Sequence, residues 1–301
     1  MAKFTAKQKA ILASYGIGYA DITGETEDGK KTVNSYVVMP DGKLCGLPLK
    51  QGNTKTGKQV YTFSLLPTNN IFIIDGIGEI MGSCCETCKD EKGNITCYAC
   101  KGNYNYSSTK KSLANNTILA YRYLNYLNNL LRANLDIIGE SVDIRIHAAG
   151  DFFNKQYAEM WHEIARDYKN NRFWTYTKKQ EFETMFDDLK NANIVKSKID
   201  SFGYNYGHID YILALYIYLV EIGEKPYICR CGIDKNQHCQ GCNSCIDYKY
   251  VLFIEHSTDY KAEKDILFPF ITEIVNAQTG ENFQEIASRI YNYLNASEKA
   301  A

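Results

Sequence analysis

The sequence lacks the segments that would direct a protein into a membrane or out of the cell. Its longest apolar run, Tyr211–Val220, is far shorter than the roughly 18 residues that a membrane-spanning helix needs. Its first residues contain no long apolar stretch followed by a small-residue cleavage site, as a secretory signal peptide would. We therefore expect a cytoplasmic protein with no membrane partner.

An excess of charge of one sign is absent too, as are the common motifs of nucleotide-binding proteins and hydrolases. The 34 Lys and Arg residues nearly balance the 35 Asp and Glu residues, so the net charge does not indicate a nucleic-acid partner. The sequence has no Gly-rich phosphate loop, serine nucleophile elbow or His-Glu-x-x-His motif. The substrate therefore stays unknown at this stage.

Three regions of the chain differ in their expected secondary structure. Residues 1–80 contain short β-branched and aromatic runs separated by turns, which predict an N-terminal β-rich segment. Residues 81–256 alternate expected strands with expected helices, and residues 257–301 predict two C-terminal helices, near 261–276 and 282–295. We expect three domains with these limits.

The alternation in the middle region predicts the fold class. An apolar stripe over residues 112–132 predicts a helix, and "SVDIRIHAAG" predicts a buried strand. Asn154 is expected to cap the next helix, and "EFETMFDDLK" predicts a further one. Such βαβ units favour an α/β fold, either a partial (β/α) TIM-like barrel or an open doubly wound sheet. In both, the functional face lies at the C-terminal ends of the strands.

The cysteines of the sequence are unusually concentrated in two short stretches. Ten of its eleven cysteines lie within "GSCCETCKDEKGNITCYACKG", residues 82–102, and "CRCGIDKNQHCQGCNSC", residues 229–245. In a reducing cytoplasm, cysteines clustered in this way are metal ligands or redox groups more often than structural disulfides. Cys45 stands apart, and we expect it to be a buried apolar residue.

The first cysteine stretch has the spacing of two C-x-x-C knuckles. Cys85 and Cys88 form one pair and Cys97 and Cys100 the other, with Cys84 as a spare thiol. Four thiolates can hold one tetrahedral zinc ion or an iron–sulfur cluster. The spacing predicts a metal site and leaves both metals open.

The second stretch favours iron over zinc. Cys239, Cys242 and Cys245 have the C-x2-C-x2-C spacing that places three thiolates on one loop, as in bacterial ferredoxins. Cys231 or Cys229 would supply the fourth ligand. We therefore expect a [4Fe–4S] cluster here, with zinc as the alternative.

One strand end also suggests a binding site. "RIHAAGDFF" ends an apolar strand with His147, Gly150 and Asp151. Gly150 would let a ligand approach the backbone, Asp151 could hold an amino or hydroxyl group, and His147 could transfer a proton. Lys178, at the end of the next strand, could pair with an anionic ligand. The alternatives are that Asp151 starts a loop and that His147 is a core residue.

Taken in order, "GNTKTGK", "YTFSLLP", "CYA", "RIHAAGDF", "FWTYTK" and the late C-x2-C-x2-C loop resemble the phage and mobile-element proteins of the gene-product-eighty-eight family. The layout is similar to that of radical S-adenosylmethionine enzymes. That resemblance implies that Cys85, Cys88 and Cys97 hold a [4Fe–4S] cluster, and that Gly150 and Asp151 contact S-adenosylmethionine. It also implies a second, auxiliary cluster. The spacing C-x3-C-x2-C of those enzymes is not present, so iron–sulfur binding is implied more directly than radical chemistry.

Two functions from different classes follow. One is an iron–sulfur protein with one or two [4Fe–4S] clusters, acting as a radical S-adenosylmethionine-like or other redox enzyme with an electron donor as partner. The other is a non-enzymatic module in which two structural zinc sites, each of four cysteines, support binding of nucleic acid or a protein.

Overall fold

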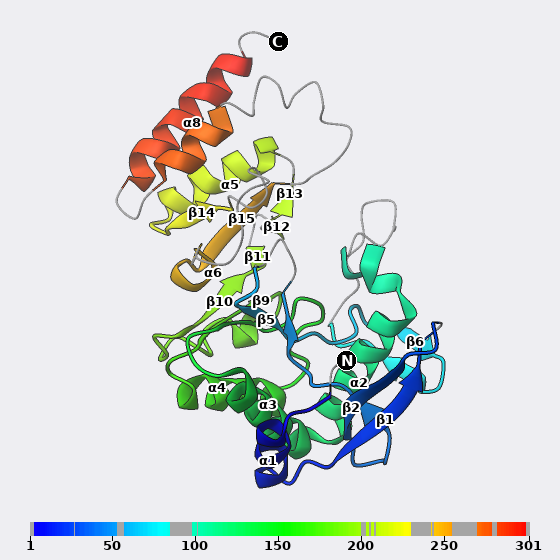
Figure 1. Ribbon diagram of the computed structural model, residues 1–301. Coiled ribbons are helices and arrows are strands. Elements are labelled where there is room, and N and C mark those ends of the chain that lie inside the picture. The colour runs from blue at the N-terminus through cyan, green and yellow to red at the C-terminus, as the bar shows by residue number, and fades with distance from the viewer. Residues whose placement is uncertain are drawn as a thin grey trace. The chain divides into compact units, whose positions relative to one another are not determined.

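The computed structural model describes residues 3–26, 28–52, 57–84, 98–100, 102–199, 203–204, 206–207, 209–229, 242, 244–254, 270–278 and 282–298 (Figure 1). The chain divides into two compact units. The first unit comprises residues 1–51 and 59–173, and the second comprises residues 52–58 and 174–301. Each unit is described by itself below.

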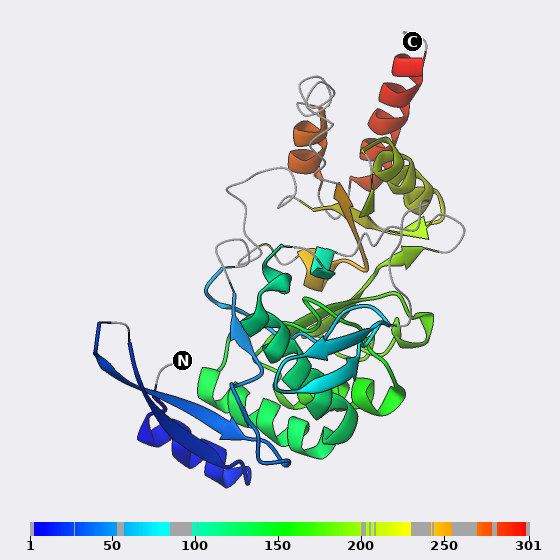
Figure 2. The ribbon, with the colours of Figure 1, turned by 90° about the vertical axis from the view of Figure 1, so that its right-hand side faces the viewer.

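The first unit begins with a helix and an antiparallel sheet. Helix α1 (Ala6–Ser14) starts with a capping box, in which the side chains of Thr5 and Gln8 each accept the backbone N–H of the other residue. Strands β1 (Tyr19–Glu25), β2 (Lys31–Val38) and β3 (Leu44–Cys45) pair in that order (Figure 2). Predicted strands in this region are confirmed, whereas α1 was not expected.

A five-stranded sheet has the order β10-β9-β8-β5-β4. Its strands are β4 (Lys50–Gln51), β5 (Val60–Thr62), β8 (Asp143–Arg145), β9 (Arg172–Thr177) and β10 (Ala192–Lys196). Strand β4 runs antiparallel to β5, and β5 runs parallel to β8. The division between the two units falls inside β9.

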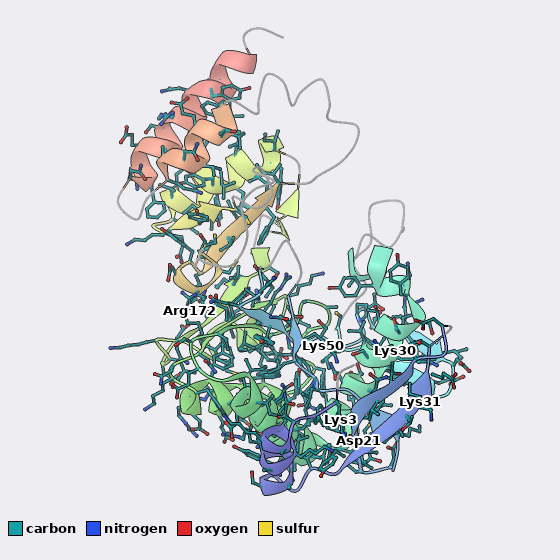
Figure 3. The ribbon with its side chains drawn as sticks, in the orientation of Figure 1. Lys3, Asp21, Lys30, Lys31, Lys50 and Arg172 are labelled. Atoms are coloured by element: carbon teal, nitrogen blue, oxygen red, sulfur yellow. The ribbon has the colours of Figure 1, made fainter. Side chains whose placement is uncertain are left out.

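An ion pair fixes the N-terminal end of strand β8 in the first unit. The Arg172 guanidinium, labelled in Figure 3, donates to both carboxylate oxygens of Asp143 at 2.7 and 2.8 Å. The Asp143 side chain is only 9 % exposed, so the bidentate pair compensates a nearly buried carboxylate.

The helices of the first unit bury one face each. They are α2 (Ser107–Arg122), α3 (Leu124–Ile138) and α4 (Lys155–Asp167). The helix predicted over 112–132 is confirmed except at Tyr123, where the backbone leaves helical geometry (φ −136°, ψ 48°) and divides the region into α2 and α3. The predicted cap of α4 is confirmed, since the Asn154 side chain accepts the backbone N–H three residues ahead at 2.9 Å.

A hairpin precedes the first cysteine stretch, and two short 3₁₀ helices lie at its end. Strands β6 (Ile71–Ile74) and β7 (Gly78–Met81) form the antiparallel hairpin. Helix η1 (Tyr98–Cys100) contains the last cysteine of the stretch, and η2 (Gly102–Asn105) begins at its last residue.

The second unit carries a parallel sheet of order β13-β15-β14. Its strands are β13 (Tyr206–Gly207), β14 (Pro226–Ile228) and β15 (Tyr250–Ile254). Strands β11 (Lys198–Ile199) and β12 (Gly203–Tyr204) form a separate antiparallel pair.

The two helices expected at the C-terminus are confirmed where the chain is described, and residues 261–269 of the first lie outside the described residues. The helices of the second unit are α5 (Ile209–Glu221), the short α6 (Ser244–Asp247), a helix over residues 270–277, and α8 (Phe283–Glu298). The buried apolar side chains of α5, the 270–277 helix and α8 share one core cluster with strands β14 and β15. The helix predicted at "EFETMFDDLK" is wrong: 3₁₀ helix η3 (Gln180–Phe182) and turns take its place.

The mixed α/β class is confirmed. In the described part of the chain the strands form several separate sheets and no closed barrel. No described helix is long and apolar enough to cross a membrane.

Candidate functional site

The predicted site at the end of strand β8 lies against an extension of strand β5. Parallel pairing continues past both strands: Phe63 N–H donates to the Arg145 carbonyl at 3.0 Å, and Ala148 N–H to the Phe63 carbonyl at 3.1 Å. Leu65 N–H then donates to the Ala149 carbonyl at 2.9 Å. The predicted segment 147–151 is therefore held beside residues 63–66.

Two buried polar side chains of helix α2 complete the hydrogen bonds where β5 ends. The Asn116 side-chain amide donates to the Ser64 carbonyl, and the Thr117 hydroxyl accepts the Leu66 N–H, both at 2.9 Å. Both side chains are almost fully buried. They satisfy backbone groups that would otherwise be buried without partners, and so fix the path of the chain after β5.

The first cysteine stretch begins in hydrogen-bonded contact with this strand end. Ser83 N–H and the Ser83 hydroxyl both donate to the Leu66 carbonyl at 2.9 Å, and Cys84 N–H donates to the Thr68 carbonyl at 2.9 Å. The Ser83 hydroxyl in turn accepts the Asp151 N–H at 3.2 Å. Ser83 thus joins the cysteine stretch to the predicted site residue Asp151.

Gly150 has a structural reason to be glycine. Its φ is +89°, and a Cβ there would lie 2.5 Å from the Ser83 Oγ and 2.7 Å from the Leu65 Cβ. Both the backbone conformation and the close packing exclude a side chain. The prediction that Gly150 makes room for a cofactor stays a prediction, because packing alone explains this residue.

The chain that follows the cysteine stretch returns to the same strand end. The Tyr104 hydroxyl donates to the Ala148 carbonyl in a long hydrogen bond of 3.4 Å. The Asn105 side chain donates to the Cys100 carbonyl at 3.1 Å, which holds the last cysteine next to helix η2. Both described flanks of the stretch therefore contact residues 147–151.

His147 is buried and neutral. Its Nε2 lies 2.8 Å from the Tyr157 hydroxyl, and the residue is only 3 % exposed. Burial lowers its pKa to about 3 and raises the pKa of Tyr157, so both groups are neutral at neutral pH, and the imidazole tautomer decides which of the two donates the hydrogen bond. Its φ of +59° is uncommon for a residue other than glycine. The geometry agrees with a core residue, and its role in proton transfer stays a prediction.

Aromatic rings connect His147 to the start of the cysteine stretch. Tyr157 stacks on Phe153 with ring centroids 4.6 Å apart, and Phe153 packs on Tyr121 at 4.1 Å. The Tyr121 hydroxyl donates to the Gly82 carbonyl at 3.2 Å. Burial raises the pKa of Tyr121, and the nearby Cys84 thiol adds to the shift.

These aromatic residues and Ser83 were not singled out from the sequence, because they are far apart along the chain. The "DFF" that follows Gly150 was the available signal, since a phenylalanine pair at a strand end has to pack against something.

Asp151 is a buried carboxylate at the strand end that the first cysteine stretch contacts. It is 4 % exposed, and its Oδ1 accepts the Phe152 N–H at 2.7 Å. A carboxylate in this position can bind a cationic or hydrogen-bond-donating group, as predicted. Contact with a cofactor stays a prediction.

The second cysteine stretch starts and ends on elements of the second unit. Cys229 follows strand β14, and its N–H donates to the Leu252 carbonyl at 2.8 Å. The Cys242 Sγ lies 3.3 Å from the Ser244 hydroxyl, a hydrogen bond suited to a thiolate. Cys245 is on helix α6.

Of the remaining predicted site residues, the structure describes Lys178 but not five of the cysteines. Lys178 follows strand β9 in the second unit and is half-buried. Cys85, Cys88, Cys97, Cys231 and Cys239 lie outside the described residues. Among those that are described, no three His, Cys, Asp or Glu side chains are grouped so that they could hold a metal ion.

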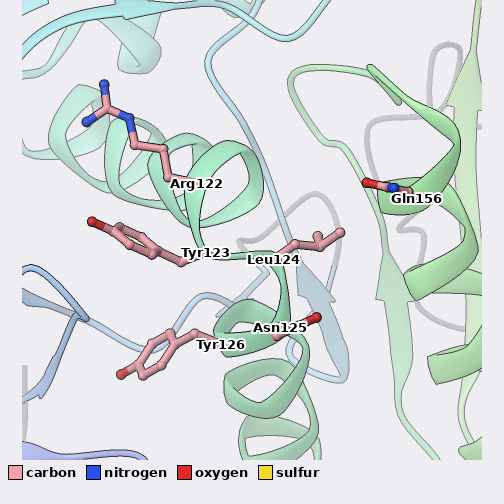
Figure 4. Close-up of a pocket in the computed structure, with 6 residues that line it drawn as sticks. All are labelled: Arg122, Tyr123, Leu124, Asn125, Tyr126 and Gln156. Atoms are coloured by element: carbon pink, nitrogen blue, oxygen red, sulfur yellow. The ribbon is translucent and has the colours of Figure 1, made fainter.

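Two of the hollows lined by described residues lie on the first unit. One, of about 580 Å³, is at the junction of α2 and α3 (Figure 4). Tyr123 and Tyr126 project to one side of the junction there, while Leu124 and Asn125 project toward Gln156. These side chains do not converge, and the hollow contains no predicted residue. The other, of about 270 Å³, is lined in part by Tyr121 and so adjoins the aromatic rings above.

Comparison with known proteins identifies the family. The model of the gene product 88 family matches residues 47–210, more than half of the 301 residues. The chain belongs to the gene product 88 family. The matched region includes the first cysteine stretch and the strand end at 147–151, and it stops before the second cysteine stretch. No curated protein and no solved structure matches the chain.

Proposed function

We propose that this gene product 88 protein is an iron–sulfur protein that carries one or two [4Fe–4S] clusters. Cys85, Cys88 and Cys97 are the proposed ligands of the first cluster. Cys239, Cys242 and Cys245, with Cys231 or Cys229, are the proposed ligands of the second. Thiolates are the usual ligands of such clusters, and both stretches have the spacing for them.

The hydrogen bond between Ser83 and Asp151 is the observation that supports the proposal most. It connects the entry of the cysteine stretch to a buried carboxylate at the end of a parallel strand. Tyr104 makes the corresponding contact from the other flank. Both flanks of the cysteine stretch are thus attached to this strand end. A cluster bound within the stretch would therefore belong to a segment that is anchored beside Asp151.

The finer proposal is radical S-adenosylmethionine-like chemistry on a partial (β/α) barrel. In the first unit, strands β5 and β8 pair in parallel, as neighbouring strands of such a barrel do. Asp151 would accept a hydrogen bond from the amino group of S-adenosylmethionine, and the bound cluster would supply the electron for cleavage of the sulfonium. The fourth thiolate, Cys100, bears on this step, since a cluster with four cysteine ligands has no open iron.

The zinc-binding module remains a second candidate for one reason. Packing against Ser83 and Leu65 accounts for Gly150, and the Ser83 hydroxyl accepts the Asp151 N–H. A metal that only stabilises the fold would require no further role for these residues. In that case the protein would bind a protein or nucleic-acid partner instead of carrying out redox chemistry.

Metal analysis separates the two candidates. Protein purified without oxygen is expected to contain about four to eight iron atoms with matching acid-labile sulfide, and to absorb broadly near 400 nm. Cys85→Ala and Cys88→Ala together should remove one cluster. About two zinc ions without sulfide would contradict the proposal.

Binding of S-adenosylmethionine tests the finer step. We expect the reduced protein to bind it, and Asp151→Asn to weaken binding at least tenfold without loss of iron. Asp167→Asn, on the exposed end of helix α4, is the matched control and should bind as the wild type does. An iron-loaded wild-type protein with no affinity for S-adenosylmethionine would leave the iron–sulfur proposal standing and overturn radical chemistry.

A further inference from the structure

A tyrosine hydroxyl lies against one of the proposed cysteine ligands in the second unit. The Tyr176 Oη is 2.8 Å from the Cys245 Sγ. Tyr176 is on strand β9 and Cys245 on helix α6, 69 residues further along the chain. The contact is thus a tertiary one that the sequence does not reveal.

Other contacts hold the two partners in this arrangement. The Asn193 side-chain amide donates to the carbonyls of Cys245 and Tyr248, both at 2.9 Å, which fixes helix α6 on strand β10. The Tyr176 ring packs edge-on against Phe253, with ring centroids 5.6 Å apart. Because both the ring and the helix are held, the hydroxyl is oriented toward the sulfur before any metal binds.

From this geometry we propose that Tyr176 is a positioning residue of the second metal centre, where its hydroxyl donates a hydrogen bond to the Cys245 thiolate. The inference rests on the proposed function, since it requires Cys245 to be a ligand. A hydrogen bond to a ligand sulfur withdraws electron density from the metal and orients the ligand. In an iron–sulfur cluster such bonds raise the reduction potential.

The neighbouring ligand has a weaker partner of the same kind. The Ser244 hydroxyl lies 3.3 Å from the Cys242 Sγ and also donates to the Cys242 carbonyl at 3.3 Å. It is therefore shared between two acceptors, and we expect Tyr176 to have the larger effect.

The test compares two tyrosine-to-phenylalanine variants of the full chain. Tyr176→Phe removes the hydroxyl at the sulfur, whereas Tyr250→Phe removes one that binds the Glu224 carboxylate at 3.3 Å in the same unit. The proteins are loaded with iron and sulfide without oxygen, and the potential of each cluster is followed by electron paramagnetic resonance. Cys245→Ala assigns the signal, since the second cluster is the one it should remove.

We expect Tyr176→Phe to keep its iron and to shift the potential of the assigned signal to a more negative value, while Tyr250→Phe leaves it unchanged. A Tyr176→Phe potential equal to that of the wild type would overturn the inference while the proposed function stands. Full iron in Cys245→Ala would overturn it as well, because Cys245 would then not be a ligand.

Loading with Co²⁺ covers the case in which the wild type takes up no iron and the iron–sulfur proposal fails. The thiolate-to-cobalt charge-transfer band should then shift in Tyr176→Phe and not in Tyr250→Phe. An unchanged band would show that Tyr176 does not act on the Cys245 sulfur.

Discussion

The Ser83 hydroxyl accepts the backbone N–H of Asp151 at 3.2 Å, across 68 residues of sequence. The same hydroxyl donates to the Leu66 carbonyl at 2.9 Å. A single buried side chain thus connects the end of strand β5, the entry of the first cysteine stretch and the residue after Gly150. Changes at any of these points should therefore affect the others.

Gly150→Ala should destabilise the protein more than a positive φ alone would. An alanine at φ +89° costs about 1–3 kcal/mol in free energy of unfolding, and its Cβ would also overlap Ser83 and Leu65. Overpacking of this kind adds about 1–3 kcal/mol. Urea unfolding followed by circular dichroism measures the sum.

Gly139→Ala is the matched control for this experiment. Gly139 has φ +97°, and a Cβ there would meet nothing within 4 Å. We expect Gly150→Ala to be less stable than Gly139→Ala by the overpacking cost. Equal losses in the two variants would mean that Gly150 is not packed as described.

Ser83→Ala should cost about 1–3 kcal/mol, because it leaves the buried Asp151 N–H without its acceptor. Ser14→Ala removes an exposed hydroxyl that donates to the Ile11 carbonyl, and is expected to change stability by less than about 0.5 kcal/mol. Chemical unfolding of both variants checks the difference. A Ser83→Ala protein as stable as the wild type would contradict the role given to this hydroxyl.

Burial of neutral His147 predicts a dependence of stability on pH. Its pKa is about 3 in the folded protein and ordinarily 6.5, so the unfolded chain binds more protons between these values. The stabilisation is complete above pH 6.5 and is lost as the pH falls toward 3. This residue alone should lower the free energy of unfolding by about 2 kcal/mol between pH 7 and pH 5.

His147→Asn is the variant that isolates this effect, since asparagine tolerates the φ of +59° that His147 adopts. Between pH 7 and pH 5, the free energy of unfolding of this variant should fall by about 2 kcal/mol less than that of the wild type. Unfolding of the wild type and of this variant in urea at pH 7 and pH 5 gives both values. An unchanged slope for His147→Asn would contradict the burial of a neutral imidazole.

The fold could be predicted where a pattern is local. The apolar stripe of helix α4, its Asn154 cap and the apolar runs of β8 and β9 all lie within a few consecutive residues. The break between helices α2 and α3 at Tyr123 could not be predicted, because the apolar positions continue with helical spacing on both sides of it. The failed helix near 181–190 shows the opposite case, in which helical periodicity is present and the described chain makes turns.

The candidate site could be predicted only in part for a similar reason. Spacing indicated the candidate cysteine ligands, and the small residues after a strand indicated Gly150 and Asp151. The partners Ser83 and Tyr176 are ordinary residues in sequence, and their importance comes from contacts with residues almost 70 positions away. Contacts over such separations depend on tertiary packing and leave no periodic signal.

Cys45 should be the least reactive of the cysteines that the structure describes. It is 4 % exposed on strand β3, and burial raises its pKa to about 12, so at pH 8 only about one thiol in ten thousand is ionised. Alkylation of the metal-free protein, followed by mass spectrometry, should therefore leave Cys45 unmodified until the chain unfolds, while the half-exposed Cys84 reacts. Cys45→Ala should leave the metal content unchanged. Rapid alkylation of Cys45 in the folded protein, or loss of metal in Cys45→Ala, would contradict its assignment as a buried apolar residue.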